Sequence, residues 1–141
     1  MIMGERLNLM NNYMDGAGEN FMSGGSDSSI AGHVPSYLVI RRNLFEKNVG
    51  YFVNAAQFGG TYFGVNYTVK NNFELKNAQY VSAEGNMFRN HWNEDQQFML
   101  AITVRNQGGN CPQCVVQYFD LSHNKMDKFF WGMNILMADN N

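Results

Sequence analysis

Cysteine is scarce in this sequence, and the only two cysteines lie close together. Cys111 and Cys114 form a Cys-Pro-Gln-Cys motif. One such pair is too little for the disulfide framework of a small secreted protein. Two thiols at this spacing can hold a metal ion, form a redox disulfide, or do neither. A structural zinc site needs two more ligands, which His91 and His123 would have to supply from separate segments.

The surroundings of the two cysteines favour the simplest of these alternatives. A thioredoxin-like motif begins a helix, whereas this one precedes a β-rich run at residues 115–119. A catalytic cysteine needs a nearby histidine, and His33, His91 and His123 stand in no recognisable signature. We therefore predict two loop thiols at the entrance of a strand, no metal, no cofactor and no enzymatic activity.

Charged side chains are also few. They make up 16% of the residues, against about 25% in an ordinary soluble domain. The net charge is only −2, so long-range repulsion between copies of the chain is small. A polar surface with so little charge is typical of proteins that work in assemblies or outside the cytosol.

Long hydrophobic runs are absent. No stretch of 18 apolar residues occurs, so we expect no membrane-spanning helix. The first residues, MIMGERLNLM, lack the basic start and apolar block of a signal peptide, and we expect no secretion signal.

Residues 1–34 differ in composition from residues 35–141. They hold six glycines and a serine-rich stretch, and four acidic side chains stand against one basic, a net charge of −3. We predict an extended N-terminal arm at 1–34 and one β domain at 35–141. The arm's charge excludes electrostatic packaging of a nucleic acid by this segment.

The arm is nevertheless more apolar than a solvated linker. We therefore expect it to pack on its own domain or on a neighbouring subunit. Its predicted assembly residues are Leu7, Leu9, Met10, Tyr13, Phe21 and Met22.

From residue 35 onward, short runs rich in β-branched and aromatic residues alternate with Gly and Asn turns. Alternation is clearest at Phe98, Leu100 and Ile102. The pattern predicts seven strands, at residues 37–42, 51–57, 61–70, 73–81, 97–106, 114–121 and 128–137.

The connections predict antiparallel pairing. Gly59-Gly60, Asn71-Asn72 and the segment 122–125 are suited to tight hairpins. We find no internal repeat of the kind that indicates a solenoid. The sequence therefore predicts an all-β fold: an antiparallel sandwich, a jelly roll or a small barrel.

One polar cluster lies next to a tryptophan. Trp92 is suited to stack on a sugar ring, with Asn90, Asn93 and Asp95 as hydrogen-bonding partners. The alternative interpretation is a capped turn or a solvated loop. Trp131 is the less suitable tryptophan, because its strand period places it in the core.

Basic side chains interleaved with tyrosines are typical of single-stranded nucleic-acid binding. Against this, ten basic residues face twelve acidic ones in the whole chain. The basic candidates are Arg41, Arg42, Lys47, Lys70, Lys76 and Arg105.

The arm, the aromatic β domain and the charge-poor surface together favour a non-enzymatic structural protein that self-associates through its arm. An accessory capsid, decoration or tail component of a virus or phage is the analogy we draw from the fold. Two alternatives stay open: a carbohydrate-binding β-sandwich module and a single-stranded nucleic-acid-binding β-barrel.

Overall fold

The computed structural model describes residues 5–28, 30–53, 67–105 and 109–136. These residues contain twelve short strands and one helix, α1 (Val49–Val53). Every strand pair in this part of the chain is parallel. No helix of the described residues is long and apolar enough to cross a membrane.

The strands form three sheets of four, and each sheet takes one strand from each of four successive coils of the chain. The first sheet contains β1 (Glu5–Met10), β4 (Ser36–Arg41), β7 (Ala78–Glu84) and β10 (Val116–Ser122). The second contains β2 (Tyr13–Asp15), β5 (Leu44–Glu46), β8 (Met87–His91) and β11 (Lys125–Phe129). The third contains β3 (Phe21–Ser23), β6 (Phe73–Leu75), β9 (Phe98–Thr103) and β12 (Trp131–Leu136).

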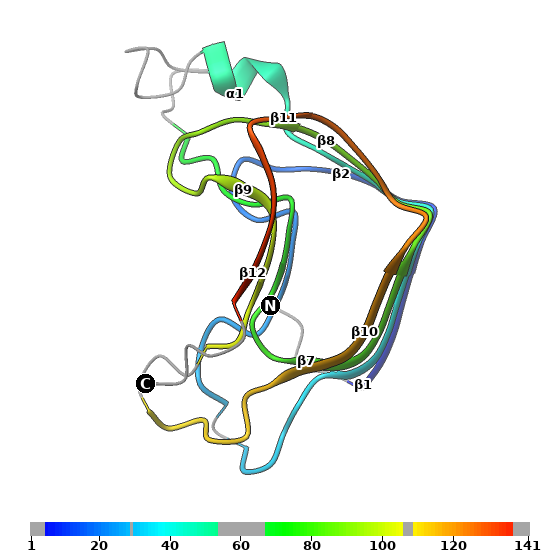
Figure 1. The fold of residues 1–141 in the computed structure, drawn as a ribbon, viewed down its shortest axis with the longest axis vertical. Coiled ribbons are helices and arrows are strands. Elements are labelled where there is room, and N and C mark those ends of the chain that lie inside the picture. Colours follow the sequence, from blue (N-terminus) through cyan, green and yellow to red (C-terminus); the bar gives the residue numbers. More distant parts are fainter. Residues whose placement is uncertain (1–4, 29, 54–66, 106–108, 137–141) are drawn as a thin grey trace.

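The architecture is therefore a parallel β-helix. Figure 1 shows the coils superimposed, with one sheet on each of three sides and a sharp corner between the first and second sheets. The predicted antiparallel sandwich, jelly roll or barrel is wrong. The strand alternation was informative, but it is the same in parallel and antiparallel strands and does not identify the partner strand.

The coils bury one apolar core between the three sheets. Phe45 of β5 and Phe88 of β8 stack with ring centroids 5.0 Å apart, and both are fully buried. Phe21 of β3 stacks on Phe73 of β6 at 4.9 Å. Equivalent inward positions of successive coils thus hold rings that lie face to face along the axis, which aligns the coils.

A ladder of asparagines fixes the sharp corner. The backbone N–H of Asn12 donates to Oδ1 of Asn43 at 2.9 Å, that of Asn43 to Asn86 at 3.0 Å, and that of Asn86 to Asn124 at 2.8 Å. These asparagines are separated by 31, 43 and 38 residues. A solenoid repeat therefore exists, contrary to our expectation, but its unequal spacing and single shared residue type conceal it.

The residue before each ladder asparagine adopts a left-handed backbone. The φ angles are +58° at Asn11, +52° at Arg42, +64° at Gly85 and +55° at His123. A left-handed residue turns the chain sharply, so the same corner recurs in every coil. The predicted hairpin at 122–125 is this corner.

The predicted extended arm is also wrong for residues 5–23, which form the first coil. Leu7 pairs in register with Leu38, and Leu9 with Ile40. Phe21 lies in the core with 5% of its surface exposed. The glycines and serines that indicated an arm lie mainly in the connections between and after these strands.

The remaining assembly residues of the predicted arm divide by exposure. Met10 and Tyr13 are exposed, whereas Met22 is half-buried. Two of the predicted strands are not observed: residues 51–53 belong to α1, and residues 67–70 are not in a strand. The rest of those two predictions, at 54–66 and including Gly59-Gly60, lies outside the described residues.

Candidate functional site

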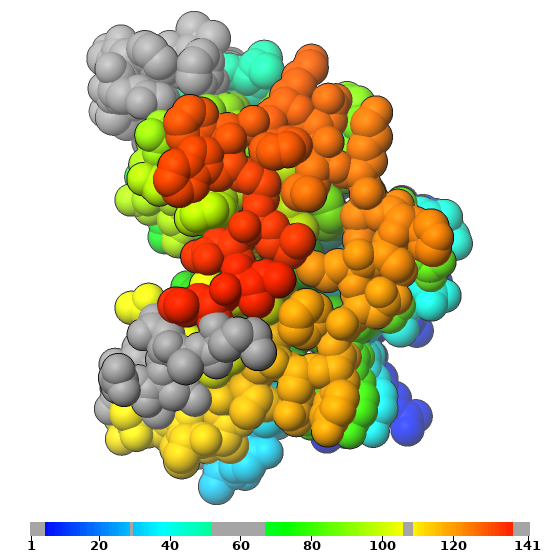
Figure 2. Space-filling model, in the orientation of Figure 1, coloured from blue at the N-terminus to red at the C-terminus, as the bar shows by residue number. Residues whose placement is uncertain are grey.

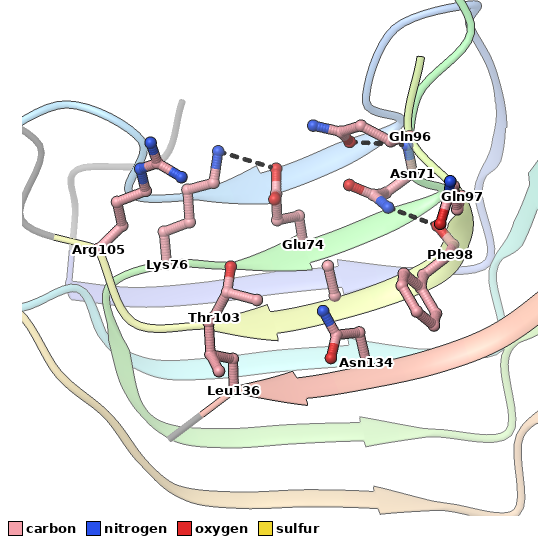
Figure 3. A pocket seen from close by; sticks show the side chains of 11 residues that line it. Asn71, Glu74, Lys76, Gln96, Gln97, Phe98, Thr103, Arg105, Asn134 and Leu136 are labelled. Atoms are coloured by element: carbon pink, nitrogen blue, oxygen red, sulfur yellow. Dashed lines mark hydrogen bonds and ion pairs between the residues drawn. The ribbon is translucent and has the colours of Figure 1, made fainter. Parts of the chain in front are cut away.

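A groove opens on the outer face of the third sheet, where β6, β9 and β12 lie side by side (Figure 3). Its volume is about 290 Å³. Its lining residues are Asn71, Glu74, Lys76, Gln96, Gln97, Phe98, Ala101, Thr103, Arg105, Asn134 and Leu136.

Strand alternation and register together produce the hollow. Leu75 and Ile102 point into the core, so their strand neighbours face outward. Ala101 of β9 lies in register between Glu74 of β6 and Asn134 of β12. The small alanine separates two larger polar side chains and leaves space between them.

The carboxylate of the groove is paired. Nζ of Lys76 lies 3.3 Å from Oε2 of Glu74, and only 3% of the surface of Glu74 is exposed. Burial raises the pKa of Glu74, and the ammonium of Lys76 opposes that shift. Beyond the groove lining, Lys70 lies 3.5 Å from Glu19 and 4.0 Å from Asp95. Much of the charge around the groove is thus balanced locally.

Amide side chains supply hydrogen-bonding capacity at one end of the groove. Asn71 donates from Nδ2 to the backbone carbonyl of Phe98, and its backbone N–H donates to Oε1 of Gln96 at 3.3 Å (Figure 3). Oδ1 of Asn71 is buried and has no donor among the described residues. Gln97 beside it is exposed. The hydrogen-bonding capacity that is open to a ligand at this end of the groove therefore comes from the exposed amide of Gln97.

Aromatic rings border the same end. Phe98 lines the groove and meets Trp131 of β12 edge to face, with ring centroids 5.0 Å apart. Trp131 also stacks on Phe130 at 5.9 Å. We predicted Trp131 to be a core residue, but 45% of its surface is exposed. It shares the strand alternation of Met133 and Ile135, and β12 is the edge strand of its sheet, so no further described coil covers this face.

The structure brings together only part of the predicted cluster around Trp92: Asn90 and Trp92 line one cavity, whereas Asn93 and Asp95 are not in its lining. Asn90 is buried, and its Nδ2 donates to Oε1 of Glu46 at 3.1 Å and to the carbonyl of Lys47 at 3.0 Å, so it joins two coils. Asp95 pairs with Lys70. Asn93 is exposed.

Trp92 itself lines a second cavity of about 220 Å³. Its indole N–H donates to Oε2 of Glu94 at 3.0 Å. His91, which we considered as a metal ligand and as the partner of a catalytic cysteine, lies in the wall of that cavity.

The cysteines are bridged, so the predicted loop thiols are corrected to a disulfide between Cys111 and Cys114. His91 ends β8, whereas His123 lies at the corner between β10 and β11. The described residues contain no group of three or more His, Cys, Asp or Glu side chains that could hold a metal ion.

The basic candidates do not form one open surface. Lys47 is fully buried, and its Nζ donates to the carbonyls of Gly16, at 2.8 Å, and of Ala17 and Gly18. Burial lowers the pKa of Lys47 to about 7. Arg41 pairs with Glu84 at 3.2 Å on the first sheet, whereas Lys76 pairs with Glu74 on the third sheet. These contacts do not favour a single-stranded nucleic-acid groove.

Comparison with known proteins gives no relative for this fold and site. No family model matches the chain, and neither a curated protein nor a solved structure matches it. The predicted role in a virus or phage particle therefore has no support.

Proposed function

We propose that this chain is a glycan-binding parallel β-helix that holds a segment of a neutral polysaccharide in the groove of the third sheet. The observation that carries the proposal is the open, amide-lined hollow between Glu74 and Asn134, with an aromatic pair at its end.

The amides match the chemistry of a sugar. Sugar hydroxyls both donate and accept hydrogen bonds, and an amide side chain offers both functions. The exposed Gln97 and the half-buried Asn134 offer hydrogen-bonding partners for several hydroxyls. The exposed ring surface of Trp131 offers an apolar face for the C–H groups of a pyranose.

The paired charges favour a neutral ligand. Lys76 is already neutralised by Glu74 at 3.3 Å. An anionic polymer would have to compete for this ammonium, and its affinity would fall steeply with salt. A neutral polysaccharide meets the amides without that competition, so we expect binding to change little between low and high salt.

The experiment is native affinity electrophoresis in gels that contain hydroxyethyl cellulose, xylan or glucomannan. We expect at least one gel to retard the chain, and Gln97→Ala and Asn134→Ala to lose most of the retardation. Gln117→Ala is the matched control, because Gln117 is an exposed glutamine on the outer face of the first sheet. Equal retardation of all three variants, or none of the wild type, would refute the groove as a glycan site.

A second candidate function is end-to-end self-association, and the apolar last coil favours it. Met133 and Ile135 pair in register with the buried residues Leu100 and Ile102. Met133 and Ile135 themselves are 41% and 48% exposed. Figure 2 shows this coil, from orange to red, across the front of the molecule. At the opposite end, the predicted assembly residues Leu7 and Leu9 are only half-buried.

The two ends are complementary in register. The asparagine ladder runs from Asn12 in the first coil to Asn124 in the last, and each step joins one coil to the next in the same direction. The first coil of a second copy stacked on the last would continue both the ladder and the aliphatic rows. Sedimentation velocity tests this: we expect mass to increase with concentration for the wild type, and Ile135→Lys to remain monomeric. A wild type that is monomeric at every concentration would contradict the candidate.

A further inference from the structure

A column of three tyrosines runs along the axis of the β-helix on the outer face of the first sheet. Tyr37 stacks on Tyr80 with ring centroids 5.0 Å apart and an interplanar angle of 8°. Tyr80 stacks in turn on Tyr118, at 4.9 Å and 9°. The rings come from the second, third and fourth coils, and all three are exposed. The column is therefore a surface feature and not part of the core.

The position that begins this column, in the first coil, is held by Arg6. The residues on either side of Arg6 pair in register with those on either side of Tyr37. All four residues of the column have left-handed backbones, with φ angles of +62° at Arg6, +60° at Tyr37, +53° at Tyr80 and +52° at Tyr118. The four side chains therefore leave the sheet at equivalent positions, so that an arginine begins the column and a tyrosine ends it.

The last ring of the column is only half covered. A left-handed backbone is unfavourable for a bulky side chain, and strained residues of this kind gather at functional sites. Stacking offsets part of this strain at Tyr80, which has a ring on each face. Among the described residues, Tyr80 is the only ring in contact with Tyr118, and 65% of the surface of Tyr118 is exposed. One face of the Tyr118 ring is thus open at the end of the β-helix.

Arg6 is the complementary group at the other end. It is exposed, and in the described part of the chain its guanidinium has neither an ion pair nor a hydrogen bond. A planar guanidinium stacks on aromatic faces. It has two faces, so the neighbouring Tyr37 leaves one of them for another ring. Arg6 and Tyr118 are in the first and last coils of one molecule, so they can meet only between two copies.

We propose that the first coil of a second copy docks on the last coil, so that its Arg6 lies between its own Tyr37 and Tyr118 of the first copy. This inference rests on the second candidate function, end-to-end self-association, and it assigns the contact that sets the polarity and register. The two ends of the chain are different, so the contact is head to tail. Such a contact does not close on itself, and association continues into axial filaments.

A second column has the same complementarity in the reverse order. The register of the second sheet aligns Tyr13 of the first coil with Lys125 of the last, and both are exposed. Docking places the ammonium of Lys125 beside the ring of Tyr13 in the second copy. The same register aligns Asp15 with Asp127, which are like charges. Asp127 is already paired with Arg89 at 3.6 Å, which reduces the repulsion.

The test measures the dissociation constant between copies by sedimentation velocity for the wild type, Arg6→Gln and Tyr118→Asn. Each variant removes one side of the contact, and asparagine tolerates the left-handed backbone at position 118. We expect each to raise the dissociation constant by about fivefold or more. Arg42→Gln is the matched control, because it removes the same charge from an exposed arginine of the second coil, away from both ends. A rise as large in the control would overturn the contact.

Mixing the two variants tests the polarity. Arg6→Gln keeps Tyr118, and Tyr118→Asn keeps Arg6, so a mixed dimer contains one intact contact. We expect the mixture, with a fluorescent label on one variant, to form dimers with the wild-type dissociation constant. A mixture that associates as weakly as each variant alone would overturn the head-to-tail contact.

The outcomes also separate this contact from self-association itself. A wild type that is monomeric at every concentration removes both. A wild type that associates, with Arg6→Gln and Tyr118→Asn at the wild-type dissociation constant, removes this contact alone.

Discussion

Asn43 and Asn86 are hydrogen-bonded to each other inside the β-helix: Nδ2 of Asn43 donates to Oδ1 of Asn86 at 3.0 Å, and both residues are almost fully buried. Asn86 also donates from Nδ2 to the carbonyl of Ile40 at 2.8 Å and to Oδ1 of Asn124 at 3.0 Å. The side chain thus links three coils at one corner. Its amide supplies hydrogen-bond partners for backbone groups that the sharp corner would otherwise leave unpaired.

We predict that Asn86→Ala lowers the free energy of unfolding by about 2–4 kcal/mol, because several buried partners lose their bonds at once. Urea denaturation followed by circular dichroism measures the change. Asn134→Ala, on the outer face of the third sheet, is the control and should change stability by less than about 0.5 kcal/mol. Equal losses in the two variants would show that the ladder does not stabilise the corner.

The buried ion pair of the groove gives a second prediction. Lys76→Met leaves the carboxylate of Glu74 buried without its cation, and we expect a loss of about 3–5 kcal/mol in unfolding free energy. The double variant Lys76→Met with Glu74→Gln removes both charges and should recover most of that loss. The same denaturation experiment decides: a double variant as unstable as the single one would mean that the unpaired charge is not the cause.

The neutral state of His91 predicts a pH dependence. The pKa is 6.5 for the ordinary group and about 4 in the folded chain. Between these values the unfolded state binds the proton and the folded state does not, so stability falls as the pH is lowered from about 6.5 to about 4 and then stays level with respect to this group. His91→Phe should be less sensitive to pH over this window than the wild type. Thermal midpoints measured at several pH values test it, and identical slopes for both proteins would contradict it.

The disulfide closes a loop of only four residues. Cys111 and Cys114 are both buried, and the neighbouring Asn110 donates its backbone N–H to Oδ2 of Asp27 at 3.3 Å. A loop this short limits the stabilisation to about 2 kcal/mol in the chain-entropy model. We expect the free energy of unfolding of the double Cys→Ser variant, measured by urea denaturation, to be lower than that of the wild type by about this amount. In the presence of reductant, the wild type should unfold at the same urea concentration as the variant. No effect of reductant on the wild type would contradict the predicted contribution.

The strand content was predictable from the sequence, but the way the strands pair was not. The alternation at Phe98, Leu100 and Ile102 predicted a strand where β9 lies. The partners of β9 are β6 and β12, which are not its hairpin neighbours but strands of the coils before and after. A periodicity confined to one strand carries no information about such distant partners.

The candidate site was predictable only in part for the same reason. Trp92 was identifiable, because an aromatic residue in a polar stretch is visible in the chain itself. The groove depends on Glu74, Ala101 and Asn134, which come from three different coils. That these three residues are neighbours can be inferred only when the strand register is known. The unequal coil lengths conceal that register in the sequence.

The central claim is that the third sheet binds a neutral glycan. The most direct test is isothermal titration calorimetry at 20 mM and at 500 mM salt, with a neutral polysaccharide that retards the chain in affinity electrophoresis. We predict binding that changes less than about threefold between the two salt concentrations, because Lys76 in the groove is already paired with Glu74. We also predict that binding is lost in Gln97→Ala, which alters the groove, but kept in Gln117→Ala, which does not. Loss of binding at high salt, or equal binding by the two glutamine variants, would contradict it.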